Sequence, residues 1–214
     1  MTVKKLSYIA AVLIVTLSAC QKEPSTSDLN RDFLVYTAYD TEVNFENFAT
    51  YFLPDSILII GNKNQAEYWS DNVAQEIIAT VATGLDAAGY TRSYDKEAAD
   101  LGIQLSYVRR VTYFVGYNNP YWWWYYPYYW APDYWGDWTG WHYPYEVYYG
   151  YTAGSLLTEM IDLETDQAGG RKLPVIWNSY IGGLLTSSTD LNLERTIAAM
   201  QQAFAQSPYL NTAE

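Results

Sequence analysis

Residues 121–151 form an aromatic stretch that constrains the fold more than any other feature of this sequence. The stretch reads YWWWYYPYYWAPDYWGDWTGWHYPYEVYYGY and holds seven of the nine tryptophans and eleven of the twenty-three tyrosines. One buried Tyr or Trp removes roughly 150–250 Å² from water, so burying all of these rings would need on the order of 3,000–4,000 Å² of covering surface. Prolines and glycines interrupt the run and favour turns and extended backbone over helix. Because every ring carries an O–H or N–H group, the stretch suits a wet interface better than an ordinary core.

Alternating residues on both sides of the stretch indicate two β-strands. The upstream strand is predicted at 107–117 and the downstream strand at 143–151. If the two pair antiparallel, each good cross-strand aromatic pair adds about a few tenths to one kcal/mol. The prediction is a long aromatic β-hairpin with its tip at residues 118–142. A tip of this length inside a compact domain is usually functional or disordered.

Residues 1–19 predict a lipoprotein signal peptide. Two early lysines precede the apolar run Ile9–Leu17, which is too short to span a bilayer as a mature helix. The end of this segment, Leu17-Ser18-Ala19-Cys20, resembles the bacterial lipobox, in which cleavage before the Cys is followed by attachment of acyl chains such as palmitate. The alternatives are a chance Cys after an ordinary signal peptide and an N-terminal anchor. Cys20 is therefore the predicted lipidation site, and two or more acyl chains would hold the protein stably at a membrane.

The composition after Cys20 predicts a polar tether and an acidic domain. Residues 20–31 have little to bury and form the expected lipid-anchored tether. No Asp follows Cys20, which favours the outer membrane, facing either the periplasm or the cell surface; Lys22-Glu23 is similar to the export signals of Bacteroidetes surface lipoproteins. Without residues 1–20 the chain has 10 basic and 24 acidic residues, a net charge near −14. This charge disfavours nucleic acid and bare anionic lipid as partners.

Residues 32–210 are predicted to form a single domain with its own hydrophobic core. Apolar spacing predicts a first helix that begins at Ser70 or Asp71 and ends before Gly89, and a second that Asp190 caps and Pro208 ends. The predicted helices span about 70–88 and 191–206, and the predicted strands about 33–39, 48–53, 101–107, 155–163 and 173–181. This order indicates an α+β fold with a single mostly antiparallel β-sheet, two helices packed on one face and the long aromatic hairpin as an insert.

Several short motifs follow one another within residues 32–210. They are Tyr39-Asp40, Asn44-Phe45, Phe48, Thr50-Tyr51, Ala99-Asp100-Leu101, Gly154-Ser155-Leu156, Asp162, Trp177 and a closing helix from Arg195 to Pro208. In this order they resemble the bacterial lipoprotein family known as domain of unknown function 4136. The resemblance implies an envelope lipoprotein with an α+β domain, and it brings no activity and no catalytic residues.

The polar residues in and around the aromatic stretch do not form a convincing catalytic or metal-binding set. His142 is the only histidine, so no second His or Cys completes a zinc site, and a place among the rings is expected. Asp133, Asp137 and Glu146 could supply the acid pair of a glycoside hydrolase, the weaker alternative, or keep the stretch soluble. The sequence predicts no catalytic residue, no metal and no cofactor, so an enzyme is not expected.

Charged residues outside the stretch are expected to be structural. Glu159, Asp162, Glu164 and Asp166 lack the spacing of a calcium loop and predict a solvated strand end. Arg109 and Arg110 are expected to pair with an acid or to stack on a ring.

The expected function is that of a non-catalytic cell-envelope lipoprotein, a binding or scaffolding module that uses an exposed Tyr/Trp-rich hairpin to contact an envelope protein. The alternatives are glycan binding, to peptidoglycan or a polysaccharide, and contact of the tip with the bilayer near the anchor. The hairpin could also pack as a lid over the sheet and bind nothing. The predicted binding residues are Trp122, Trp123, Trp124, Trp130, Trp135, Trp138, Trp141, Tyr125, Tyr129, Asp133 and Asp137.

Overall fold

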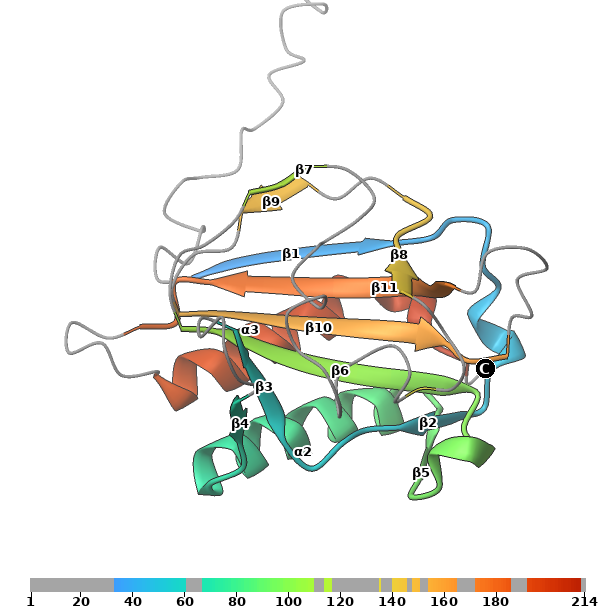
Figure 1. The fold of residues 1–214 in the computed structure, drawn as a ribbon, viewed down its shortest axis with the longest axis horizontal. Coiled ribbons are helices and arrows are strands. Elements are labelled where there is room, and N and C mark those ends of the chain that lie inside the picture. The colour runs from blue at the N-terminus through green and yellow to red at the C-terminus, as the bar shows by residue number, and fades with distance from the viewer. Residues whose placement is uncertain are drawn as a thin grey trace, which may run out of the picture. The chain divides into compact units, whose positions relative to one another are not determined.

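A computed structural model describes residues 33–60, 67–109, 114–116, 135, 140–145, 148–150, 154–164, 172–185 and 192–212. The predicted signal peptide, Cys20 and the tether lie outside the described residues, as does most of the predicted hairpin tip. The described part of the chain is built on a large β-sheet with helices behind it (Figure 1).

The main sheet has its long strands at the centre and short ones at its margins. Its strand order is β1-β11-β10-β6-β2-β5. These strands are β1 Leu34–Tyr39, β2 Thr50–Phe52, β5 Thr91–Ser93, β6 Leu101–Val108, β10 Ser155–Asp162 and β11 Lys172–Gly182. Three short strands join it from the side: β3 Ile57–Ile60 pairs with β6, β4 Glu67–Trp69 with β3, and β8 Gly140–His142 with β11.

The sheet is mixed, so the prediction of a mostly antiparallel sheet was wrong. β10 runs antiparallel to both β6 and β11, and β1 runs antiparallel to β11. However, β2 and β3 both run parallel to β6, β5 runs parallel to β2, and β8 runs parallel to β11. A helix connects β3 and β4 to the later strands, and a crossover of this kind returns the chain in the parallel direction. The α+β class is confirmed.

Both predicted helices are present, with one change at a cap. Helix α2 spans Asn72–Ala87; the side chain of Asp71 caps it by accepting from the backbone N of Ala74 at 3.0 Å. Gly89 follows with a φ of 103°, the left-handed conformation predicted for it. Helix α3 spans Leu193–Ala205, and its cap is Asn192, not Asp190 as predicted. Asp190 itself lies outside the described residues.

Short 3₁₀ helices complete the described connections. They are η1 Phe45–Asn47, η2 Lys96–Ala98 and η5 Pro208–Leu210. Between η2 and β6, Asp100 accepts hydrogen bonds from the backbone N atoms of Ala49 and Thr50, each at 2.8 Å. The hydroxyl of Thr50 accepts in return from the backbone N of Asp100 at 3.1 Å. Asp100 thereby fixes the start of β2 beside the start of β6.

Two separate hydrophobic cores lie on the two faces of the sheet. The helix-side core combines α2, α3 and one face of the central strands, and it includes Ile77, Val81, Leu105, Trp177 and Met200. Both helices lie behind the sheet in Figure 1. The second core lies on the other face, which no helix among the described residues covers; we call it the helix-free face. Aromatic residues from the stretch described above pack there.

A second, two-stranded sheet involves the flanks of the aromatic stretch. Strand β7 Phe114–Gly116 pairs antiparallel with β9 Tyr148–Gly150, with Val115 opposite Tyr149. These residues fall within the two strands that alternation predicted. Residues 117–134 lie outside the described residues, so the hairpin tip itself stays a prediction.

Candidate functional site

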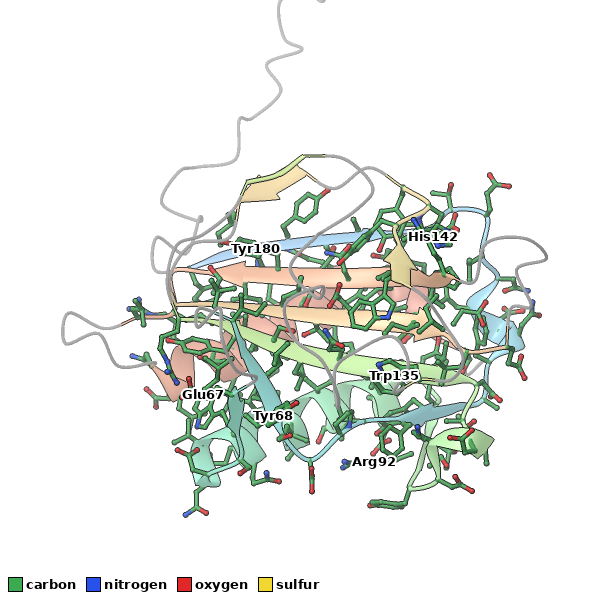
Figure 2. All side chains as sticks on the ribbon, viewed as in Figure 1. Glu67, Tyr68, Arg92, Trp135, His142 and Tyr180 are labelled. Carbon is green, nitrogen blue, oxygen red and sulfur yellow. The ribbon has the colours of Figure 1, made fainter. Side chains whose placement is uncertain are left out.

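Four aromatic residues of the stretch lie on the helix-free face, and we call them the aromatic cover: Trp135, Trp141, Tyr143 and Tyr145. The side chain of Trp141 is fully buried, Trp135 and Tyr143 are 6% and 2% exposed, and Tyr145 is half-buried. Figure 2 shows Trp135 and His142 on the face of the sheet turned away from the helices. The part of the stretch that the structure describes is therefore packed against the sheet.

The pairing of β8 with β11 positions most of the cover. Trp141 lies opposite Leu173 in a parallel register that starts at Gly140 and Lys172. Because side chains alternate along an extended chain, Trp141, Tyr143 and Tyr145 turn to the same side. That side is the sheet, since all three join the second core.

Trp135 packs against β6 at Gly102, a position without a side chain. A Cβ atom at Gly102 would lie 2.8 Å from the indole Cζ3 of Trp135, so the ring rests directly on the backbone of β6. The indole also makes an edge contact with the ring of Phe52, with centroids 5.9 Å apart. Gly102 thus permits the close approach that buries this tryptophan.

A row of polar side chains crosses the sheet beneath the cover. Glu159 of β10 lies opposite Gln104 of β6 on one side and opposite Asn178 of β11 on the other. All three side chains are fully buried. A buried polar group costs free energy unless it is hydrogen-bonded, so this row requires partners.

Tyrosines of the cover supply partners for Glu159 and Asn178. The phenol of Tyr143 donates a short hydrogen bond to Oε1 of Glu159, and Nε2 of Gln104 donates to Oε2 at 3.2 Å. The phenol of Tyr145 donates to Oδ1 of Asn178 at 2.9 Å. The cover is thus attached to the sheet by polar contacts as well as by apolar packing.

Glu159 is the carboxyl group whose ionisation the fold disturbs most among the described residues. Burial raises its pKa to about 8, although the hydrogen bonds from Tyr143 and Gln104 act in the opposite direction. Burial, and next the neighbouring Glu159, hold the pKa of Tyr145 well above its usual range. At neutral pH the carboxyl is therefore mostly protonated, and the phenol of Tyr145 is neutral.

His142 lies at the edge of the cover and is half-buried. Burial lowers its pKa, and the charge of Lys172 lowers it further, against the opposing effect of Asp40. Its Nδ1 atom is buried and has no hydrogen-bond partner among the described residues. His142 is thus a half-buried side chain of lowered pKa between Trp141 and Tyr143 in the chain, and its expected stacking or hydrogen bonding with the rings stays a prediction.

The structure brings together two of the predicted binding residues. Trp135 and Trp141 lie in the second core, so neither is an exposed ring. The other predicted residues lie outside the described residues: Trp122, Trp123, Trp124, Trp130, Trp138, Tyr125, Tyr129, Asp133 and Asp137. Glu146 also lies outside them.

The prediction of a solvated strand end at Glu159 and Asp162 was wrong. Glu159 is fully buried and Asp162 is 5% exposed, whereas Glu164 is exposed and Asp166 lies outside the described residues. The signal that could have placed Glu159 is the alternation of Leu157, Glu159 and Ile161, which puts the acid on a face with two aliphatic neighbours.

The acid expected beside Arg109 is present. The guanidinium of Arg109 forms a bidentate ion pair with the carboxylate of Glu67, with N–O distances of 2.7 and 2.8 Å. Arg110 lies outside the described residues. No group of three His, Cys, Asp or Glu side chains within the described ranges is placed to hold a metal ion. In the same ranges, no helix has the length and apolar character needed to span a membrane.

Comparison with known proteins decides the family. A family model described as "Domain of unknown function (DUF4136)" matches residues 35–209. The chain belongs to the DUF4136 family. A solved structure of a DUF4136 family protein from Bacteroides thetaiotaomicron VPI-5482 is similar to it, with 47% identity and a TM-score of 0.76, covering 86% of this chain and 100% of that one.

Weaker similarity extends to two structures of the PelC dodecamer from Paraburkholderia phytofirmans, one of them a point variant. Their identities are 11% and 12% and their TM-scores 0.39 and 0.37, with 85% of this DUF4136 chain and 99% of theirs covered. A comparison with curated proteins gave no match.

The contact between Gly102 and Trp135 yields a first prediction for this DUF4136 domain. Gly102→Ala would place a methyl group in the space of the indole, so we expect the ring to move and the free energy of unfolding to fall by about 1–3 kcal/mol. Urea denaturation measures the change. In a Trp135→Ala background the same substitution should cost much less, and an equal cost in both backgrounds would show that the contact is absent.

The buried carboxyl yields a second prediction, on stability against pH. The pKa of Glu159 is raised on folding from 4.5 to about 8, so its contribution to stability is fully present below pH 4.5 and is lost as the pH rises to about 8. Relative to Glu159→Gln, the free energy of unfolding of the unmodified chain should fall by about 1.4 kcal/mol per pH unit across this window. Urea denaturation at several pH values measures this difference, and parallel curves for the two proteins would contradict it.

Proposed function

We propose that this protein is a non-catalytic lipoprotein of the cell envelope that binds or scaffolds an envelope protein through aromatic residues 117–134. The observation that carries the proposal is that the described residues on either side of this segment are built into the fold. Gly116 ends a strand that pairs with β9, and Trp135 packs on Gly102. The segment between them therefore begins and ends at ordered positions.

The residue types of this segment support a binding role. It contains Trp122, Trp123, Trp124 and Trp130 together with several tyrosines. Trp and Tyr are enriched among the residues that contribute most to protein–protein binding, because each brings a large contact area at a small entropic cost. The described rings of the stretch pack in the second core, and the proposal assigns the rings of residues 117–134 to a partner.

The state of Glu159 supports a non-catalytic role. It is the described carboxyl with the most perturbed pKa, which is a common sign of an active site. However, its side chain is fully buried and its oxygens are bonded to Tyr143 and Gln104. In this arrangement a substrate has no access to the carboxyl, and the perturbed acid serves the attachment of the cover.

The sequence around Cys20 supports lipid attachment. A lipobox-like end of the signal peptide and a polar tether would hold the acidic domain close to a membrane surface, and we assign that surface to the outer membrane. The tether would allow residues 117–134 to reach a partner in the same compartment.

Cys20→Ala is expected to abolish incorporation of labelled palmitate, because this thiol is the only cysteine sulfur in the chain. The measurement is metabolic labelling in the native host followed by isolation of the protein. Lys22→Ala, two residues away, should leave the labelling unchanged. Palmitate retained by the Cys20→Ala protein would contradict the assignment of the anchor.

The binding proposal predicts that the triple variant Trp122→Ala, Trp123→Ala, Trp124→Ala loses at least tenfold in cross-linked yield of its specific envelope partners. Quantitative cross-linking in intact cells, read by mass spectrometry, measures this yield. The matched control is Tyr94→Ala, which removes an aromatic ring that is 84% exposed elsewhere on the domain. An unchanged partner set in the triple variant would contradict the proposal.

The same variants test the glycan alternative, which rests on Asp133 and Asp137 among the rings. Retention on purified peptidoglycan or polysaccharide that the triple variant loses, without any change in cross-linked proteins, would favour a glycan ligand over a protein.

A further inference from the structure

Residues 141–145, which carry three aromatic residues of the cover, have a near copy elsewhere in the chain. They read Trp-His-Tyr-Pro-Tyr, and residues 124–128 read Trp-Tyr-Tyr-Pro-Tyr. The pattern Trp-x-Tyr-Pro-Tyr occurs at these two places in the sequence and at no third one. We propose that the helix-free face is a docking site for this pattern, and that residues 124–128 are a second occupant that can replace residues 141–145 on it.

This docking site goes beyond the binding role proposed above. It concerns which segment of the chain occupies a described face of the sheet, and it does not depend on which partner residues 117–134 bind. We call residues 141–145 the resident segment.

The first residue of the pattern is held by packing and by backbone pairing. The indole of Trp141 is fully buried, and Trp141 lies opposite Leu173 where β8 runs parallel to β11. This pairing extends over three positions, from Gly140 to His142. A segment with few backbone pairs opens locally at a low free energy, so the resident segment has little pairing to give up.

The two tyrosines of the pattern are held by hydrogen bonds. The phenol of Tyr143 donates to Glu159 of β10, and the phenol of Tyr145 donates to Asn178 of β11 at 2.9 Å. The two acceptors lie directly opposite each other in the register of these strands. Residues two positions apart in an extended chain turn to the same side, about 7 Å apart. A Tyr-x-Tyr spacing thus serves both acceptors, whereas a Phe at either place would remove one donor.

Residues 124–128 match the resident segment at every position that these contacts use. The matching indole and phenols are those of Trp124, Tyr126 and Tyr128. The one difference is Tyr125 in place of His142, at a position that turns to the other side of an extended chain. Pro144 is exposed and follows the paired residues of β8, so it removes no donor from that pairing, and Pro127 has the same place in the copy.

The chain is long enough for the exchange while Trp135 stays on Gly102. Residue 128 precedes Trp135 by seven positions, and seven extended residues span up to about 23 Å. Gly102 and Asn178 lie on β6 and β11 with β10 between them, about 10 Å apart across the strands and about 7 Å along them. Trp135 can therefore remain packed while either segment occupies the docking site.

The second occupant belongs to the same chain and not to a second copy. A short connection gives a segment an effective concentration on the order of millimolar at its own docking site. A second copy has no such advantage, and the net charge of −12 on each chain opposes its approach.

Disulfide trapping in the full chain tests the exchange. Cys20→Ala removes the only native cysteine. The pair Tyr125→Cys and Pro174→Cys places two thiols opposite each other if residues 124–128 take the register of β8, in which His142 lies opposite Pro174. Neighbouring strands are about 4.8 Å apart, a separation that a disulfide bridges. Mass spectrometry after equilibration in a glutathione buffer measures the ratio of intramolecular disulfide to reduced protein.

The two segments compete, so weakening the resident one should favour the trap. With Tyr143→Phe and Tyr145→Phe added, we expect the disulfide ratio of the Tyr125→Cys pair to rise about tenfold, the combined effect of two lost hydrogen bonds. Adding Tyr126→Phe and Tyr128→Phe as well should cancel the rise, because both segments then lack the hydroxyl groups.

Two matched pairs serve as controls. His142→Cys with Pro174→Cys should form its disulfide readily in the otherwise native chain, which shows that Pro174→Cys folds and reacts. Its ratio should fall when Tyr143→Phe and Tyr145→Phe are added, the opposite of the change at residue 125. Tyr129→Cys with Pro174→Cys lies four residues further along the same segment, and its ratio should stay low in both backgrounds.

An unchanged ratio for the Tyr125→Cys pair in the Tyr143→Phe, Tyr145→Phe background, or an equal rise for the Tyr129→Cys pair, overturns the proposal. Disulfides between two chains in place of one within a chain would assign the docking to a second copy and would overturn the exchange as well. These results would leave the binding role of residues 117–134 standing, since that role is measured by the cross-linking of envelope partners.

Discussion

The central sheet has two apolar faces, and the described helices cover one of them. β10 is buried along its whole length on both faces, so a second layer is a physical requirement of the fold. Within the described part of the chain, tryptophans and tyrosines form this second layer. Extended aromatic residues can cover a sheet face because each ring buries a large area, whereas a helix would need several turns for the same purpose. This second layer requires the close packing of Trp135 on Gly102 and the pairing of β8 with β11.

The second layer differs from the first in its chemistry. Beneath the helices the sheet presents mainly aliphatic and aromatic side chains, whereas beneath the cover it presents Gln104, Glu159 and Asn178. Replacing a buried polar group by an apolar one of similar shape is often neutral or stabilising, so such a row is not needed for stability. It instead makes the attachment of the cover specific, because Glu159 and Asn178 each accept from a hydroxyl of the cover at a defined place. Tyr143 and Tyr145 fulfil this role, since a Phe at either position would pack but leave a polar atom unsatisfied.

Local patterns predicted both helices and the longer strands. Both helices and the strands β1, β6, β10 and β11 were found from apolar spacing and capping residues, and Gly89 was assigned correctly. β3 was missed because Ile57–Ile60 is a continuous buried run without alternation, and β4 and β5 are too short for a periodic signal. The parallel pairings were missed because they depend on which distant strands meet, which short-range periodicity does not encode. Glu159 was assigned to solvent for a similar reason: its burial results from Tyr143, a residue that the sequence places on another element.

The register of β8 has a consequence for how the chain is made. Gly140–His142 pairs with residues 172–174, and the polar row beneath it includes Asn178. A chain that emerges from its N-terminus therefore presents the aromatic stretch before the strand that receives it exists. During this interval the rings have no native surface to cover, and exposed aromatic segments of this kind favour aggregation. The described rings of the cover therefore wait for β11 before they can pack, a delay that arises from the order of the strands alone.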